Sequence, residues 1–347
     1  MKRPIGNDAV LRLLVLCALG GAIATAGARK LAPQQAATAN QSYATAPGPG
    51  DAPVPELALP DFPGGVVYAP APHETDPNIQ RFLAVNIAMF RRDVKRDAPL
   101  LVWFSGTGGT PAGGWLFLRA AADAGYRVIG LTYDNGVSDP QTCGPKPDPA
   151  CSDHFRQKRI FGDNLTNDID DLPAESVVNR LTKVLQYLDA HHHGEGWSRY
   201  LKHGGPDWQR IAVAGHSQGG GVAAYIAKKE RAYRVINLSG AWDRTEQGSK
   251  QFAPWITAPS ATPMDRWYCA YHAKETNAAP MKAAYAAMNV PPDHIRVLTL
   301  EPVRQPNTPA NVDVYHGSMI AERSTPRDAN GAPAYAADWA FMLGTPK

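Results

Sequence analysis

The stretch that decides the fold is VAGHSQGGGVAAYIAKK, residues 213–229. Small and apolar residues lead to a serine, Ser217, and a helix-forming run follows it. Glycines fill positions 219–221, where the helix would begin, although a glycine costs a helix about 1 kcal/mol relative to alanine. A sharp strand-to-helix turn explains them, because the residues two positions either side of its apex must lack a Cβ. Gly215 and Gly219 hold those two positions, so the spacing predicts chemistry at Ser217.

Around this stretch, apolar runs alternate with helical patterns. We expect strands at 81–90, 99–106, 126–134, 209–215, 234–240, 266–272 and 295–300, and helices at 114–125, 176–191, after Ser217, at 279–289 and at 334–343. Nearly continuous apolar strands separated by helices indicate an α/β protein with a mainly parallel central sheet and helices on both faces. Two long, Pro-rich, irregular segments, about 135–175 and 242–264, predict loop insertions over the site.

The pentapeptide GHSQG, residues 215–219, resembles the G-x-S-x-G nucleophile elbow of the α/β-hydrolase superfamily. The order of the expected elements extends this resemblance to nearly the whole chain after Val66. More narrowly, LVWFSGTGGTP (101–111), GYRVIGLTYDN (125–135), a pair of cysteines and GHSQGGGVAA (215–224) are similar to a little-characterised secreted bacterial branch of this superfamily. The resemblance implies an α/β-hydrolase fold and a Ser-His-acid triad, but no settled substrate.

A serine nucleophile needs a base that a carboxylate orients, and in this superfamily the chain order is Ser, acid, His. His316, in VDVYHGSMI, follows the last expected strand after a loop long enough to return over Ser217, so we expect it to be the general base. His294 precedes that strand and would lie at the wrong end of the sheet. His272 ends the preceding strand and is more simply a packed or hydrogen-bonded histidine.

The acid is open between two carboxylates, because both follow the end of an expected strand. Glu275, in YHAKETN, stands where the superfamily's acid most often lies, and we prefer it. Asp243, in SGAWDR, follows the strand before and is the alternative. The glutamate is a departure from the usual aspartate, and its extra methylene must be accommodated.

Acyl transfer places negative charge on the former carbonyl oxygen, which needs fixed backbone donors. The resemblance implies the N–H of Gln218, at the helix start, and that of Thr107, in SGTGGTP, as the oxyanion hole. Trp242 and Trp255 stand in the second insertion and would line an apolar acyl or aromatic site.

The N-terminus reads as a targeting segment. A basic start, an apolar run at 13–26 and a small-residue site before Arg29 predict a cleaved signal peptide at 1–28 and a secreted or periplasmic protein without a stable membrane anchor. An Ala/Pro-rich disordered spacer at 29–60 and a single domain at 61–347 would follow. An oxidising compartment favours pairing Cys143 with Cys151, which bracket a Pro-rich loop, and leaves Cys269 as a buried thiol.

Composition excludes other classes. A net charge of +3 without a basic stripe argues against a nucleic-acid partner. No residues stand at metal-ligand spacing, and we expect no metal and no organic cofactor. The sequence therefore predicts a serine hydrolase, and the resemblance to the superfamily implies first of all an esterase acting on a small-molecule or polymeric carboxylic ester. An acyltransferase, an amidase and a non-catalytic binding protein with this fold are the alternatives, and the oligomeric state is not predicted.

Overall fold

The computed structural model describes residues 59–246, 249–310 and 312–345. The chain divides into two compact units, Met1–Asn40 and Gln41–Lys347, and every described residue belongs to the second. The predicted signal peptide at 1–28 and nearly all of the predicted spacer at 29–60 lie outside the described residues. Among the described helices, none is both long and apolar enough to cross a bilayer.

The core of the described chain is an eight-stranded sheet of order β1-β2-β4-β3-β7-β8-β9-β10. Its strands are β1 (Gly65–Tyr68), β2 (Ile87–Arg91), β3 (Leu100–Phe104), β4 (Arg127–Leu131), β7 (Ile211–His216), β8 (Arg234–Leu238), β9 (Trp267–His272) and β10 (Ile295–Leu298); β5 (Leu201–Lys202) and β6 (Gly205–Pro206) form a separate pair. Within the eight-stranded sheet only β2 runs against its two neighbours and the other pairs are parallel, whereas β5 and β6 pair antiparallel. The predicted α/β architecture with a mainly parallel central sheet is confirmed.

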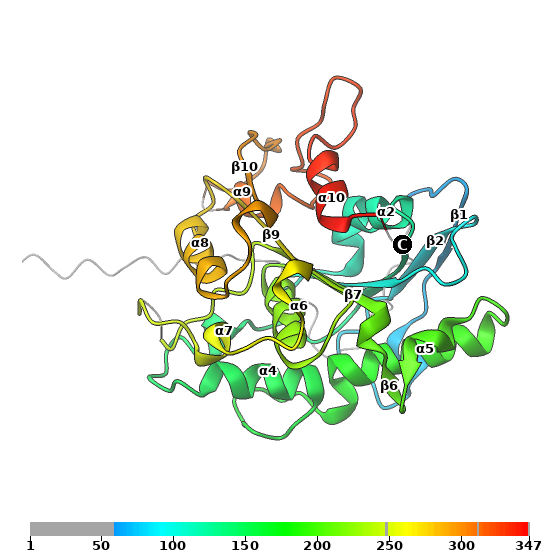
Figure 1. Ribbon diagram of the computed structural model, residues 1–347, viewed down its shortest axis with the longest axis horizontal. Helices are drawn as coiled ribbons and strands as arrows, with labels where there is room; N and C mark the ends of the chain where they lie inside the picture. Colours follow the sequence, from blue (N-terminus) through cyan, green and yellow to red (C-terminus); the bar gives the residue numbers. More distant parts are fainter. Residues whose placement is uncertain (1–58, 247–248, 311, 346–347) are drawn as a thin grey trace, which may run out of the picture. The chain divides into compact units, whose positions relative to one another are not determined.

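Helices cover both faces of this sheet (Figure 1). The α-helices are α1 (Pro72–Thr75), α2 (Trp115–Asp123), α3 (Asp139–Thr142), α4 (Cys151–Phe161), α5 (Val177–His191), α6 (Gln218–Lys229), α7 (Pro254–Thr257), α8 (Ala278–Ala287), α9 (Val314–Gly317) and α10 (Ala336–Leu343); short 3₁₀ turns lie at Pro111–Gly114, Pro173–Glu175, Trp197–Tyr200, Trp208–Arg210, Met264–Arg266 and Pro292–His294. Side chains of β3 alternate between the faces, as a strand dictates. Val102 packs with α5 and α6, whereas Leu101 and Trp103 pack with α2 and α10.

The first predicted insertion, 135–175, differs from the expectation of an irregular loop. It contains the eleven-residue helix α4, which packs against α5, α6 and α7. The polar sequence of α4 does not indicate a packed helix, because two of its arginines are buried in ion pairs rather than exposed. Arg156 Nε lies 2.5 Å from Asp243 Oδ2, and Arg159 Nε lies 2.9 Å from Asp171 Oδ2.

Three further details depart from or match the sequence-based expectations. The strand expected at 81–90 is present only as β2, and β1 was not expected. A disulfide joins Cys143, just after α3, to Cys151 at the start of α4, as predicted. Cys269 is a buried free thiol, as predicted, and burial raises its pKa.

Candidate active site

Ser217 lies at the apex of the turn between β7 and α6, with φ 56° and ψ −121°. A non-glycine residue with positive φ is strained, and strain of this kind concentrates at functional sites. The turn is closely packed, since a Cβ at Gly215 would lie 2.2 Å from Gly219 O, and one at Gly219 would lie 2.0 Å from Phe104 O. The close approach of the backbone therefore requires glycine at both positions. The Ser217 side chain is partly exposed at the carboxyl end of β7.

Glu275 and His316 form a buried pair at the same edge of the sheet. The Nδ1 atom of His316, in α9, lies 2.7 Å from Glu275 Oε2, three residues after β9. The other carboxylate oxygen, Oε1, accepts a hydrogen bond from Ser239 Oγ at 2.7 Å and one from His272 N at 2.7 Å. The carboxylate favours the tautomer in which Nδ1 carries the proton and Nε2 is free to accept one.

Asp313 holds the two segments that carry this pair. Its Oδ1 accepts from the N–H groups of Tyr315 and His316, each at 3.1 Å, and so caps α9. Its Oδ2 accepts from Thr276 N at 2.7 Å, one residue after Glu275. One carboxylate therefore ties His316 to the segment that carries Glu275.

His216, the residue before Ser217, holds the backbone of His316 against the elbow. Its Nε2 lies 2.8 Å from His316 O, and the two ring centroids are 4.5 Å apart. Burial, together with the neighbouring His316, lowers the pKa of His216 to about 3. His216 is therefore neutral at ordinary pH and donates from Nε2 to that carbonyl.

The loop after β3 packs on the elbow from the other side. A Cβ at Gly106 would lie 3.1 Å from the Cβ of Ser217, so the two backbones are close. Thr107 Oγ1 donates to Gln218 Oε1 at 2.8 Å, which links the loop to the first residue of α6. Across the described ranges, neither the N–H of Thr107 nor that of Gln218 has a hydrogen-bond acceptor. Both predicted oxyanion donors therefore lie beside Ser217 with their hydrogen unpaired.

The alternative acid, Asp243, is engaged elsewhere. Its Oδ2 accepts from Arg156 Nε at 2.5 Å, from Ser152 Oγ at 3.1 Å and from Trp255 Nε1 at 3.1 Å. The structure thus brings Glu275, and not Asp243, to His316.

The two tryptophans nominated for substrate binding differ in exposure. Trp255 is 3% exposed and packs edge-on against Tyr225 at 5.4 Å, so little of its ring is open to a ligand. Trp242 is half-buried at the margin of the same core. Sequence reasoning did not single out Ser239, His216, Asp313 or Asn135. Of these, only His216 lies inside the elbow motif itself, and no sequence pattern assigned a role to any of the four.

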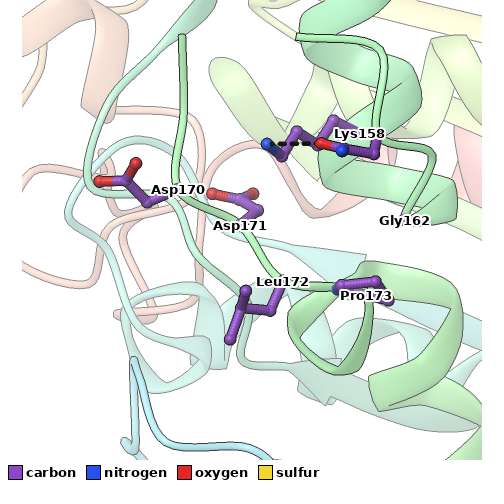
Figure 2. Close-up of a pocket in the computed structure, with 7 residues that line it drawn as sticks. Lys158, Gly162, Asp170, Asp171, Leu172 and Pro173 are labelled. Atoms are coloured by element: carbon purple, nitrogen blue, oxygen red, sulfur yellow. Dashed lines mark hydrogen bonds between the residues drawn. The ribbon is translucent and has the colours of Figure 1, made fainter. Parts of the chain in front are cut away.

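A separate cavity of about 380 Å³ lies between α4 and the segment that leads to α5 (Figure 2). Figure 2 shows Lys158 extending from α4 toward the segment that carries Asp170 and Asp171. Lys158 Nζ donates to Thr166 O at 2.7 Å, and Asp171 is paired with Arg159, so these charges are satisfied within the protein. None of the residues grouped around His316 lines this cavity.

No family model matches the sequence, and no curated protein matches it. Among solved structures, the chain is similar to a thermophilic esterase from Thermogutta terrifontis, at 15% identity over 81% of this chain and 91% of that chain, with a TM-score of 0.42. It is similar to a bacterial heroin esterase at 15% identity, over 82% and 86% of the chains, with a TM-score of 0.40. An esterase of the bacterial hormone-sensitive lipase family is 15% identical over 83% and 86% of the chains, with a TM-score of 0.41.

Proposed function

We propose that the protein is a serine hydrolase that cleaves carboxylic esters through an acyl-enzyme. The observation that carries the proposal is the buried hydrogen bond between Glu275 and His316, held next to a strained turn that presents Ser217. A nucleophile, a base and a carboxylate that orients the base are the parts that this chemistry requires.

In the proposed reaction, Ser217 Oγ attacks the acyl carbon while His316 Nε2 takes its proton. Glu275 stabilises the imidazolium that forms, and the N–H groups of Thr107 and Gln218 bind the developing oxyanion. The imidazolium then gives its proton to the departing alkoxide, and the alcohol leaves. Water attacks the acyl-enzyme with His316 as base again, which releases the acid and restores Ser217.

We also propose that the protein works in an oxidising compartment outside the cytoplasm. The N-terminal sequence pattern and the disulfide between Cys143 and Cys151 support this. Expression of the full chain in a bacterial host, followed by N-terminal mass mapping of the product, tests it. A mature chain that begins near Arg29 is expected, and a cytoplasmic, unprocessed chain contradicts the proposal.

The first experiment is intact-mass analysis after exposure to a fluorophosphonate, which reacts with activated serines. A single adduct on Ser217 is expected in the wild type. It should be absent in Ser217→Ala, strongly slowed in His316→Ala and unchanged in Ser198→Ala, a control at an exposed serine. A folded wild type that takes up no label contradicts the proposal and favours a binding protein with this fold.

An ester and amide panel with added alcohols then tests the reaction type. Free carboxylic acid as the main product of ester cleavage is expected. Transfer products that outcompete the free acid would identify an acyltransferase, and cleavage of amides but not esters would identify an amidase.

A further inference from the structure

The segment that follows β4 is hydrogen-bonded to the loop that carries Thr107. Asn135 Nδ2 donates to Gly106 O at 2.7 Å and to Gly109 O at 2.8 Å, while the Asn135 carbonyl accepts from Gly108 N at 3.0 Å. Asn135 is 3% exposed, so these bonds are shielded from water. Three hydrogen bonds from one residue thus fix a turn of four residues.

Two neighbouring features also fix the conformation of this loop. Tyr133 Oη donates to Ser105 O at 2.7 Å, just before the loop. Gly108 has φ 67°, a conformation that suits glycine and lets the chain turn around the Asn135 side chain.

The hydrogen bond from Asn135 to Gly106 O also sets the orientation of the Thr107 N–H. In a trans peptide the C=O and the following N–H point to opposite sides. Because Gly106 O accepts from Asn135, the N–H of Thr107 in the same peptide is turned away from Asn135. The backbone of Gly106 also meets Ser217, since a Cβ there would lie 3.1 Å from the Ser217 Cβ.

We infer that Asn135 is a positioning residue that presets the Thr107 N–H as an oxyanion donor, an inference that rests on the proposed function. The donor would otherwise have to be ordered during the reaction, and a preorganised dipole avoids that cost. The effect belongs to the transition state, because only there does the oxygen carry a full negative charge.

Steady-state kinetics of Asn135→Ala on an activated ester is the first test. Loss of a complete oxyanion donor lowers kcat by about 10²- to 10³-fold, so a displaced donor should lower it by about 10- to 100-fold. KM should change by less than about twofold, because ground-state binding does not use this bond. The matched control is Asn179→Ala, at the start of α5, whose Nδ2 also donates to a backbone carbonyl, Ala174 O at 2.8 Å, and whose kcat should stay at the wild-type value.

Asn135→Asp provides a readout that a purely structural role would not move. Facing two carbonyl oxygens in a buried position, the new carboxyl should bind its proton tightly, and only the protonated form can donate one of the two hydrogen bonds. The nearby charges, Asp134 with Arg81 and Arg159, are the same in all variants. The ratio of kcat for Asn135→Asp to kcat for Asn135→Ala should therefore rise as pH falls. A ratio independent of pH would overturn the inference.

Hydrogen exchange separates this inference from the proposed function. In Asn135→Ala the amides of the loop at 106–109 should exchange faster, while those of α6 stay protected. If wild-type Ser217 is labelled and active but the variant shows unchanged exchange and kcat, only the positioning role of Asn135 is wrong. If the wild type is never labelled, the proposed function fails, and with it the role of Asn135 in catalysis. A fall in kcat matched by Asn179→Ala would also overturn the inference, in favour of general destabilisation.

Discussion

Hydrogen bonds, rather than a permanent cation, surround the carboxylate of Glu275. Its carboxylate accepts from Ser239 Oγ, from His272 N and from His316, and it is fully buried. In the described part of the chain, no lysine or arginine forms a salt bridge with it. Among the described residues, the cation that would contact this carboxylate in the proposed reaction is the imidazolium of His316. This arrangement favours proton uptake at His316 when Ser217 attacks.

Replacement of Glu275 by glutamine tests the acid directly. The amide keeps the shape but removes the charge and favours the wrong tautomer of His316, so kcat should fall by about 10³- to 10⁴-fold. Thermal unfolding and the rate of fluorophosphonate labelling, measured together, separate this loss from misfolding. A variant that keeps more than a tenth of wild-type kcat would rule out Glu275 as the triad acid.

Asp243→Asn should give the opposite pattern. It leaves the Arg156 guanidinium buried beside a neutral amide, and loss of one partner of a buried ion pair costs about 3–5 kcal/mol of unfolding free energy. Denaturant unfolding should show this loss, while folded enzyme still labels at Ser217. Labelling abolished at unchanged stability would make Asp243 the acid.

At the scale of elements, a glycine in α6 allows α4 to pack closely against the helix of the elbow. A Cβ at Gly221 would lie 2.4 Å from Arg156 Nη2, so α6 leaves room for a guanidinium that α4 supplies. Arg156 is 2% exposed and lies 5.1 Å from the ring of Trp255. Gly221 thus accommodates a helix-to-helix contact, whereas Gly219 accommodates the backbone of β3.

Gly219→Ala should destabilise the elbow, because its Cβ would meet the Phe104 backbone, which cannot move away. Overpacking of this kind costs about 1–3 kcal/mol or more. Gly113→Ala is the matched control, since no atom lies within 4 Å of the Cβ it would add. Denaturant midpoints of the two variants check the prediction, and equal midpoints would contradict it.

The disulfide should stabilise the start of α4. It closes a loop with a sequence separation of 8, for which the chain-entropy model gives about 2–3 kcal/mol. The double variant Cys143→Ser/Cys151→Ser should unfold at lower denaturant than the wild type. A reducing agent should lower the wild-type midpoint to that of the variant and leave the variant unchanged, whereas an unchanged wild-type midpoint would show that the bond adds no stability.

Most of the elements could be predicted because burial on both faces gives strands such as β3 and β4 continuous apolar runs. The amphipathic spacing of α5 also agrees with the structure, in which Ser176 caps the helix by accepting from Asn179 N at 3.3 Å. The helix α4 could not be predicted this way. Its buried face includes Arg156 and Arg159, whose burial depends on carboxylates far away in the sequence.

At the scale of the whole molecule, the site is a product of the parallel sheet. Consecutive strands carry its residues at their carboxyl ends, where parallel strands meet at one edge. These are Thr107 after β3, Asn135 after β4, Ser217 after β7, Ser239 after β8 and Glu275 after β9. The rule that sites lie at the carboxyl ends of parallel strands therefore reduces, from the sequence alone, the number of candidate catalytic residues. It cannot choose between Glu275 and Asp243, because that choice depends on hydrogen bonds from neighbouring strands.

Stability should depend on pH through Asp139. Burial, and then the Asp243 carboxylate, raise its pKa from 3.8 to about 7, against the opposing charge of Arg156. The folded protein therefore holds this proton more tightly than the unfolded chain. The stability contribution is complete below about pH 4, falls as pH rises to about 7, and is constant above that.

Asp139→Asn removes this titration. The Tm of the variant minus that of the wild type should increase between pH 4 and pH 8, and calorimetry across that range checks it. Asp293→Asn, at an exposed carboxyl, is the control and should show a constant difference. Parallel curves for Asp139→Asn and the wild type would contradict the prediction.

The double attachment of Asp313 has a consequence for how this chain can diversify. Asp313 accepts hydrogen bonds from both Thr276 N and His316 N. These bonds fix His316 at the end of the segment that follows β10. In the described part of the stretch between β10 and Asp313, no residue hydrogen-bonds to Glu275 or to His316. We therefore expect insertions or deletions there to leave the geometry of Glu275 and His316 unchanged. Libraries of variable length in this stretch should retain labelling at Ser217 as long as Asp313 is kept.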